Sequence, residues 1–224
     1  MEINGEKRHA IYLAGEMAVG ISHEIRNPIT TVRGFLQLFG SKSEFMQYKE
    51  YFNLMIDELD KVNSIIKEFL FMAKNKKVDL RVRDLNMIVK DLYPLIQANA
   101  VISDKDVDVE LGVIPALLLD EHEIRRLILH LASNGLEAMF PGGKLTIKTY
   151  KDGEKVVLSV QDQGCGIAHD ILDKIGTPFF TTKDNGTGLG LAVCNSIAAR
   201  HNGAIQVETG PAGTTVLIRF MSAS

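Results

Sequence analysis

Four sets of residues along the chain have types and spacings that could do chemistry, and the first surrounds a histidine. His23 is followed directly by Glu24, and Asn27 comes one helical turn later. A neutral imidazole has one free lone pair, which can attack phosphorus if a base takes the proton of the other ring nitrogen. Glu24 could be that base. Ile21 and Ile25 flank His23, so helical spacing points the imidazole away from the apolar stripe, toward solvent.

The second set lies in a segment with helical periodicity, residues 121–139. Asn134 comes four residues after His130, so the two side chains share one face of the expected helix. An asparagine oxygen is a ligand that Mg²⁺ accepts when nucleotide phosphates hold the same ion. Asn134 is therefore a candidate Mg²⁺ ligand, although a single asparagine on a helix is more often a surface amide.

The third set follows an alternating run, residues 155–161, that predicts a buried strand. A carboxylate at Asp162 could accept a hydrogen bond from an exocyclic amine such as adenine N6. Gly164 and Gly166, followed by Ile167, would let the backbone approach a flat base closely. A tight turn is the plainer explanation of the same glycines.

The fourth set leads into a further helix, expected at residues 189–200. Backbone N–H groups and the positive end of the dipole at a helix N-terminus bind phosphate oxygens. No strand comes directly before these glycines, which disfavours a dinucleotide-binding fold. The segment before the helix is rich in glycine and threonine, as expected of a loop that covers a nucleotide. The candidate phosphate contacts are Thr182, Lys183, Gly186, Thr187, Gly188, Leu189 and Gly190.

Two domains are expected to position these residues, and the first is a helical hairpin over residues 1–76. Apolar residues recur at steps of three and four from about residue 6 to 39 and again from 45 to 69. Gly40 could end the first helix and Ser43 could cap the second. A hairpin of this length cannot cover its own apolar stripes. We therefore expect a homodimer in which two hairpins form a four-helix bundle.

The second domain is expected over residues 77–224, after a polar stretch at 74–77. Its pattern predicts an α+β sandwich with helices packed on one face of a mixed sheet. We expect helices at 85–98, 121–139 and 189–200, and strands at 107–113, 144–150, 155–161, 204–208 and 214–220.

Composition excludes several classes of protein. The formal net charge of -3 provides no basic surface for nucleic acid. No apolar run reaches the roughly 18 residues that cross a bilayer. Cys165 and Cys194, the two cysteines, lack metal-type spacing and are expected to be free thiols in the cytoplasm. Many proteins with such a two-domain core have a sensor segment upstream, which could anchor the full-length protein in a membrane.

In this order, the motifs resemble those of the sensor histidine kinases over nearly the whole chain. SHEIRNP resembles the phospho-acceptor box, HLASNGLEAM the asparagine box, DQGCGI the first glycine box, TPFFTTK the phenylalanine box and GTGLGLAV the second glycine box. The string GISHEIRNPITTVRGFLQL together with TPFFTTK is most similar to the sporulation kinases of endospore-forming bacteria.

The resemblance implies a dimerisation and phosphotransfer hairpin followed by an ATP-binding domain of the Bergerat (GHKL) type. It implies that the γ-phosphoryl group of ATP moves to His23, with Glu24 as base, Asn134 as Mg²⁺ ligand and Asp162 as adenine contact. The partner would be the receiver domain of a response regulator, which accepts the group on an aspartate, and a protein inhibitor of the hairpin would be a further partner. Asn27 matches a position associated with phosphatase activity.

The chain departs from the family pattern at two positions and leaves two other functions open. The family usually has asparagine where this chain has His130 and alanine where it has Gly135, so the contact made by His130 is undecided. One alternative is a Bergerat ATPase in which Glu137 or Glu123 activates water for hydrolysis. The other is a dimeric scaffold that binds nucleotide without transferring a phosphoryl group.

Overall fold

The computed structural model describes residues 24–73, 78–183 and 186–221. The chain divides into two compact units, residues 1–76 and 77–224. None of the described helices combines the length and apolar character that a bilayer span requires. The two described cysteines are free, Cys165 exposed and Cys194 buried.

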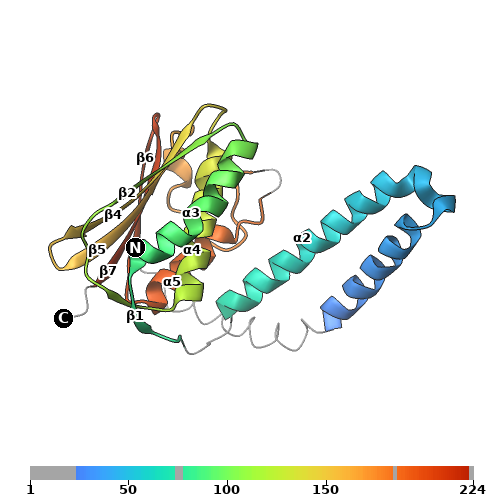
Figure 1. The fold of residues 1–224 in the computed structure, drawn as a ribbon, viewed down its shortest axis with the longest axis horizontal. Helices are drawn as coiled ribbons and strands as arrows, with labels where there is room; N and C mark the ends of the chain where they lie inside the picture. The colour runs from blue at the N-terminus through green and yellow to red at the C-terminus, as the bar shows by residue number, and fades with distance from the viewer. Residues whose placement is uncertain (1–23, 74–77, 184–185, 222–224) are drawn as a thin grey trace. The chain divides into compact units, whose positions relative to one another are not determined.

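The first unit is a helical hairpin (Figure 1). Residues 24–40 are helical, and a short 3-10 helix η1 (Ser43–Tyr48) leads into the long helix α2 (Lys49–Ala73). The expectation that Ser43 caps the second helix is wrong, because Lys42 is the N-cap residue of η1 and no side chain caps it. Backbone hydrogen bonds form the connection instead: the Phe45 N–H donates to the Lys42 carbonyl at 3.1 Å.

Phenylalanine rings pack where the two helices of the hairpin meet. Phe39 lies 5.6 Å from Phe45 and 6.4 Å from Phe52, measured between ring centroids. Farther along, Arg33 and Asp60 join the two helices through paired hydrogen bonds of 2.8 and 3.1 Å. Aromatic packing at the turn and a bidentate ion pair along the helices therefore set their antiparallel pairing.

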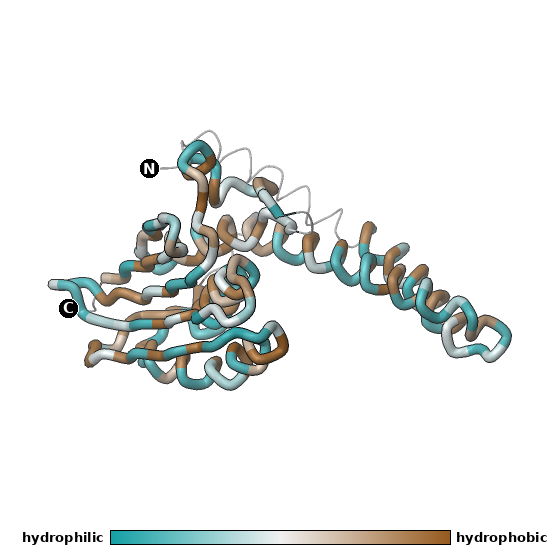
Figure 2. Tube along the Cα trace, turned by 90° about the horizontal axis from the view of Figure 1, so that it is seen from above, coloured by the Kyte–Doolittle hydropathy of each residue, from teal (hydrophilic) through white to brown (hydrophobic). Residues whose placement is uncertain are grey.

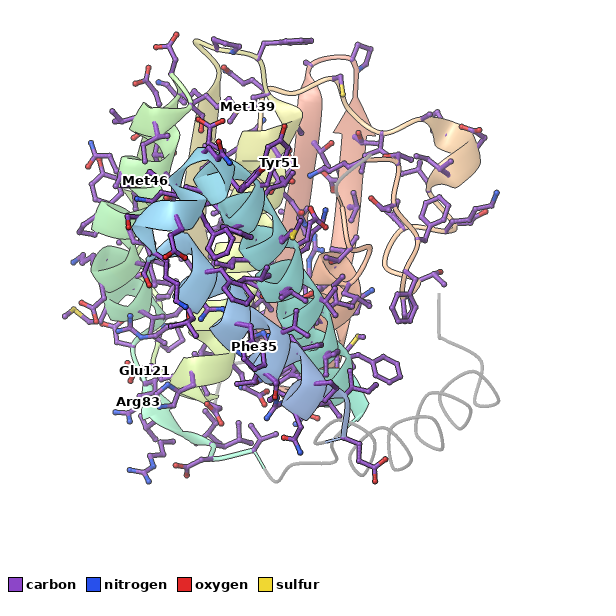
Figure 3. The ribbon with its side chains drawn as sticks, turned by 90° about the vertical axis from the view of Figure 1, so that its right-hand side faces the viewer. Phe35, Met46, Tyr51, Arg83, Glu121 and Met139 are labelled. Carbon is purple, nitrogen blue, oxygen red and sulfur yellow. The ribbon has the colours of Figure 1, made fainter. Side chains whose placement is uncertain are left out.

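A single hairpin leaves most of its apolar stripe uncovered. Leu70, at 6% exposed, is the one buried apolar side chain among the described residues of this unit. Phe35 on the first helix and Tyr51 on α2, both labelled in Figure 3, are 55% and 62% exposed. Apolar residues recur along both helices in Figure 2. The other large exposed apolar residues of the two helices and η1 are Ile25, Val32, Leu38, Phe39, Met46, Tyr48, Leu54, Met55 and Val62.

The second unit contains a five-stranded sheet in the order β2-β4-β5-β7-β6. Strands β2 and β4 are parallel, and the other neighbours are antiparallel, which makes the expected mixed sheet. The strands are β2 (Asp106–Leu111), β4 (Lys144–Asp152), β5 (Lys155–Gln161), β6 (Ala204–Gly210) and β7 (Gly213–Met221). Strand β2 ends before the expected residue 113, where Val113 is 98% exposed.

Three helices lie on one side of this sheet (Figure 1). They are α3 (Leu85–Ile102), α4 (Glu121–Ala138) and α5 (Gly190–Arg200). Leu127 and Ile128 of α4 and Val156, Leu158 and Phe220 of the sheet are buried and belong to the core. The expected sandwich with helices on one face is therefore confirmed.

Three short elements complete this unit. The antiparallel pair β1 (Arg81–Arg83) and β3 (Leu117–Leu119) forms a small second sheet, and η2 (His169–Ile171) is a single 3-10 turn. Next to the pair, Arg83 Nε lies 3.5 Å from Glu121 Oε2 (Figure 3). The β1–β3 pair brings the beginning of the domain next to the start of α4, whereas η2 lies between β5 and α5.

Candidate nucleotide and phosphotransfer sites

A buried carboxylate lies where β5 ends. Asp162 is 7% exposed, and its Oδ1 accepts hydrogen bonds from the Gly164 N–H at 2.8 Å and the Thr214 N–H at 3.1 Å. Burial raises the pKa of Asp162, and these two N–H groups oppose the rise. Both bonds go to one oxygen, so Oδ2 is the oxygen that could accept a hydrogen bond from a bound base. The fixed carboxylate has the chemistry expected of an adenine contact.

Neighbouring backbone atoms leave no room for a side chain at the two glycines that follow Asp162. A Cβ on Gly164 would lie 2.5 Å from the Ala138 carbonyl oxygen at the end of α4. Gly166 has a φ of 73°, and a Cβ there would meet the Gly210 carbonyl oxygen. The Ile167 N–H donates to Thr209 Oγ1 at 2.8 Å. Close packing against α4 and the β6–β7 turn is therefore a second reason for these two glycines, and close approach to a base stays a prediction.

Helix α4 passes close to Asp162 because Gly135 has no side chain. A Cβ on Gly135 would lie 2.5 Å from Leu145 Cδ1 and 3.3 Å from Asp162 Cβ. The same position lies 3.8 Å from Asp162 Oδ2. Glycine at this position therefore leaves more room beside the carboxylate oxygen than alanine would.

Two side chains of α4 face the start of α5. The position of a Cβ on Gly190 lies 3.4 Å from His130 Nδ1 and within 3.9 Å of both amide atoms of Asn134. The N-cap residue of α5 is Leu189, and no side chain caps it. The first N–H groups of a helix have no partner within the helix, so they can bind an anion here. His130, Asn134 and the N-terminus of α5 thus meet at one point, as the sequence predicted for the first two.

The imidazole of His130 is held neutral. Burial, together with the charge of Arg126, lowers its pKa from 6.5 to about 4. Arg126 Nε lies 3.5 Å from His130 Nε2 and donates toward it. The guanidinium of Arg126 stays protonated and can only donate hydrogen bonds. The ring nitrogen that it faces, His130 Nε2, therefore acts as an acceptor.

The loop before α5 is tied to α4 by an ion pair. Lys183 Nζ lies 2.7 Å from Glu137 Oε2, and Ser133 Oγ donates to Glu137 Oε1 at 2.8 Å. Burial alone would raise the pKa of Glu137, but these hydrogen bonds outweigh it and the pKa is lowered. Thr182 beside Lys183 is exposed. The pair links the phenylalanine-box segment to the asparagine-box helix, which sequence did not reveal.

Three hydrogen bonds close the glycine-rich turn. Thr187 Oγ1 accepts a hydrogen bond from the Leu189 N–H at 3.3 Å. Gly188 has a φ of 67°, and its carbonyl accepts from the Phe179 N–H at 3.0 Å. Gly186 donates its N–H to the Lys183 carbonyl at 3.1 Å. The expected phosphate loop therefore has a defined turn directly before α5.

Glu123 belongs to a buried cluster at the other end of α4. It is 6% exposed, and its Oε2 lies 3.1 Å from Arg200 Nε and 3.9 Å from His201 Nδ1. Burial raises the pKa of Glu123, and Arg200 and His201 oppose the rise. No sequence motif pointed to this cluster of Glu123, Arg200 and His201. A hint was available, since Glu123 lies next to Ile124 on the apolar face of the predicted helix.

The open groove between α3 and α4 includes Ser133 and Glu137 in its lining but lies apart from the residues expected to contact the base and the metal ion. It has a volume of about 500 Å³ and is lined on the α4 side by Leu129, Ala132, Ser133, Leu136 and Glu137. Asn134 and Asp162 do not line it. No group of three or more His, Cys, Asp or Glu side chains in the described ranges could hold a metal ion. A cation at Asn134 would therefore depend on phosphate oxygens for most of its ligands.

The expected phospho-acceptor, His23, lies outside the described residues. Its neighbours Glu24 and Asn27 are described, and both are exposed on the helix over residues 24–40. The backbone carbonyl of Asn27 accepts a hydrogen bond from Thr31 Oγ1 at 3.0 Å. The assignments of His23, Glu24 and Asn27 therefore stay predictions.

Two family models match the chain, one for each unit. Residues 14–77 match the His Kinase A (phospho-acceptor) domain. Residues 119–223 match the histidine kinase-, DNA gyrase B- and HSP90-like ATPase. The first match contains His23, Glu24 and Asn27, and the second contains Asn134 and Asp162.

Relatives and solved structures agree with these matches. Sporulation kinase C of Bacillus subtilis (strain 168) is 34% identical over 214 residues, which are 93% of this chain and 50% of the relative. Full-length ShkA in complex with AMPPNP has a TM-score of 0.80 at 25% identity, covering 93% of this chain and 46% of that chain. Histidine kinase ThkA in complex with the response regulator protein TrrA has a TM-score of 0.71 at 28% identity, covering 97% and 64%. This chain thus spans about half the length of that curated relative.

Proposed function

Because the chain belongs to the sensor histidine kinases, we propose that it moves the γ-phosphoryl group of ATP to His23 and then to an aspartate of a response regulator. In the first step a bond forms between an imidazole nitrogen and Pγ, the bond from Pγ to the bridging oxygen breaks, and ADP leaves. Glu24 takes the imidazole proton. In the second step the bond between phosphorus and the imidazole nitrogen breaks, a bond from phosphorus to a carboxylate oxygen of the receiver domain forms, and the imidazole regains its proton.

The observation that carries this proposal is the meeting of His130, Asn134 and the uncapped start of α5 in the unit that also contains the buried carboxylate of Asp162. Asp162 would accept from the adenine amine, while the N–H groups of α5 and Lys183 would bind the triphosphate. Charge neutralisation and positioning supply most of the catalysis in phosphoryl transfer. Mg²⁺, held by the Asn134 oxygen and phosphate oxygens, would add to that neutralisation.

The proposed partners follow from the hairpin. Its exposed apolar stripe supports a homodimer in which two hairpins form a four-helix bundle. A solved relative, ThkA, forms a complex with the response regulator protein TrrA, which supports a receiver domain as the phosphoryl acceptor here. The similarity to sporulation kinase C supports a place in a sporulation phosphorelay. Exposed Asn27 is the residue we assign to dephosphorylation of the partner.

The contacts of two glutamates argue against the ATPase alternative. Glu137 is paired with Lys183 and Ser133, and Glu123 is buried against Arg200. A general base must have an oxygen within reach of the water that it activates. Both carboxylates are instead engaged in contacts within the domain.

Autophosphorylation with γ-labelled ATP tests the proposal. The wild-type chain should acquire label that is stable to alkali and labile to acid, and His23→Gln should acquire none. His122→Gln is a matched control, because His122 is an exposed histidine of α4 and its loss should leave labelling unchanged. Label that persists in His23→Gln contradicts the assignment, and release of free phosphate without labelled protein favours the ATPase.

A further inference from the structure

We propose that His201 is a positioning residue for the nucleotide: as a neutral imidazole it joins the end of α5 to the start of α4, and its protonation in acid releases this contact and weakens ATP binding. The inference deepens the proposed function and rests on it, since it takes ATP as the ligand held between these helices. His201 is the C-cap residue of α5 and belongs to the buried cluster with Glu123 and Arg200. None of the proposed phosphoryl-transfer steps uses that cluster.

Both ring nitrogens of His201 contact a backbone group. Nδ1 lies 2.8 Å from the carbonyl oxygen of Ile197, one turn earlier in α5. Nε2 accepts a hydrogen bond from the Asp120 N–H at 3.0 Å, and Asp120 is the N-cap residue of α4. The side chain of His201 is fully enclosed, at 0% exposed. The imidazole therefore connects the last turn of α5 to the first turn of α4.

These two contacts define the protonation state in which the ring can make both. A carbonyl oxygen can only accept, so Nδ1 must carry the proton that faces Ile197. A backbone N–H can only donate, so Nε2 must keep its lone pair toward Asp120. The neutral Nδ1–H tautomer satisfies both partners. An imidazolium has a proton on each nitrogen, and its Nε2–H would face the Asp120 N–H, so protonation breaks this contact.

Charged groups of both helices face the ring. Glu123 Oε2 of α4 lies 3.9 Å from His201 Nδ1, and the same oxygen lies 3.1 Å from Arg200 Nε at the end of α5. The carboxylate of Asp120 also interacts electrostatically with His201. The two carboxylates favour an imidazolium, whereas burial and the guanidinium oppose it. Their balance affects how readily the ring is protonated but not the consequence, since a protonated Nε2 cannot accept from the Asp120 N–H.

The contact lies at one end of a helix pair whose other end is the expected phosphate site. The start of α4 meets the end of α5 at His201. At the opposite end, the position of a Cβ on Gly190, the first residue of α5, lies 3.7 Å from Nδ2 of Asn134 in α4. A shift of α5 at the His201 end would therefore move its N-terminal N–H groups relative to Asn134. Such a shift lowers the fraction of protein that has the binding geometry, and the apparent affinity falls with that fraction.

Calorimetry with AMPPNP and Mg²⁺ on the full 224-residue chain, repeated from about pH 8 to about pH 5.5, tests the inference. In His201→Gln the amide oxygen takes the place of Nε2 as acceptor and does not titrate. The two proteins should bind within about threefold of each other near pH 8, and wild type should lose about tenfold more affinity than His201→Gln as pH falls. Titration of the nucleotide and of Asp162 is common to both proteins and cancels in the ratio of their affinities.

A second variant separates the two contacts of the ring. The amide of His201→Asn can still donate from the position of Nδ1 but does not reach Asp120, so its affinity near pH 8 should be about tenfold below wild type. His122→Gln is the matched control, because His122 is an exposed histidine of α4, and it should follow the wild-type profile at each pH.

Thermal unfolding at each pH distinguishes positioning from a purely structural role. A structural role would lower the unfolding temperature of His201→Asn and leave the nucleotide affinity of the folded protein unchanged. That result overturns the inference. So does a ratio of wild-type to His201→Gln affinity that stays constant with pH.

Nitrogen chemical shifts of the imidazole give a readout that needs no folded variant. Long-range proton–nitrogen spectra of the wild-type chain, with His201 assigned from its backbone, should show the Nδ1–H tautomer near neutral pH. In acid the amide signal of Asp120 should shift together with protonation of the ring, because this N–H loses its acceptor. An Nε2–H tautomer, or an Asp120 amide that does not follow the titration of the ring, overturns the inference.

Failure of this inference and failure of the proposed function are distinguishable. A wild-type chain that binds no nucleotide, or one that labels without His23, contradicts the proposed function. A chain that binds nucleotide and labels on His23, but shows any overturning result above, contradicts only the role of His201.

Discussion

The two units of the chain differ in how far their large apolar side chains are exposed. In the ATP-binding unit a core of large apolar residues is buried, as at Leu127 (0% exposed) and Phe220 (1%), although Phe140 is 77% exposed. In the hairpin Phe35 and Leu54 are 55% and 61% exposed. Exposed apolar area of this extent on a helical surface indicates a protein interface. The ATP-binding unit therefore completes its own core, whereas the hairpin needs a second surface to complete its packing.

The same contrast extends to the polar residues. Asp162 is enclosed and held by two backbone N–H groups, while Glu24 and Asn27 are exposed on a helix. An enclosed carboxylate suits a small ligand that is bound in a fixed position. An exposed helical face suits the proposed phosphotransfer site, which a nucleotide domain and then a receiver domain would both have to reach.

The largest effect should follow from a charge on the hairpin stripe. In Leu54→Glu each dimer would bury two carboxylates and lose two leucine contacts, each worth roughly 1.5–3 kcal/mol. Dimer affinity should fall at least about a hundredfold, measured by analytical ultracentrifugation. Val101→Glu makes the same kind of change at an exposed apolar residue of α3 and should leave association unchanged. If Leu54→Glu stays as dimeric as wild type, Leu54 is not at the interface.

A substitution at Asp162 should abolish the chemistry of the other unit and spare its fold. In Asp162→Asn the amide oxygen can still accept from Gly164 and Thr214, but an NH₂ group replaces Oδ2 and faces the donor N6 of adenine. ATP affinity should fall roughly ten- to a hundredfold, because two donors are opposed in a buried site. Calorimetry measures the affinity, and thermal unfolding checks that the domain is intact.

The pH dependence of ATP binding gives a related test of Asp162. Burial raises the pKa of this carboxyl group in the free protein. The ionised form is the acceptor, so affinity should rise as pH rises through that raised pKa and then level off. Asp162→Asn should lose this rise. An equal rise in both proteins would show that another group is responsible.

Sequence predicted most of the ATP-binding unit because its signals are local. Alternation placed β5 at residues 155–161, and helical periodicity placed α4 to within a residue of its end. The strands β1 and β3 were missed because three residues are too short to show alternation. The parallel pairing of β2 with β4 depends on neighbours distant in sequence, which alternation does not report.

The residues of the site could be predicted from sequence motifs, but the contacts between them could not. Asp162 and Asn134 stand in contiguous strings whose chemistry can be read directly. The contact between Lys183 and Glu137 joins residues 46 positions apart, and the closeness of His130 to the start of α5 depends on how α4 and α5 pack. In the hairpin, the failed cap at Ser43 shows the same limit, because a 3-10 turn replaced the expected helix start.

A moderate effect on stability should follow from the cap of α4. Asp120 accepts from the N–H groups of Asp79, His122 and Glu123, so Asp120→Ala should cost the ATP-binding unit about 1–2 kcal/mol. Asp84, the N-cap of α3, accepts from one N–H group, and Asp84→Ala should cost less. Urea unfolding of the two variants measures the difference, and equal losses would contradict the assignment.

The sign of the pH effect at Asp120 follows from its hydrogen bonds. Burial alone would raise the pKa of Asp120, but the three backbone N–H groups outweigh it and the folded pKa lies below the unfolded value. Its contribution is therefore present above the unfolded pKa and is lost as pH falls through the folded pKa. The unfolding free energies of wild type and Asp120→Ala should converge in acid. Curves that stay parallel would show that the carboxylate charge is irrelevant.

The smallest effect is expected from substitution of Glu137, and the size of that effect distinguishes the kinase mechanism from the ATPase mechanism. Its ion pair with Lys183 joins side chains that are 54% and 39% exposed, and exposed pairs contribute about 1 kcal/mol or less. Glu137→Gln should therefore change autophosphorylation by about fivefold or less. A carboxylate that activated water would be a general base, and its removal would lower phosphate release by about a hundredfold or more. Labelling of His23 and release of free phosphate, measured in one reaction, decide between the two, because only the ATPase mechanism makes Glu137 indispensable.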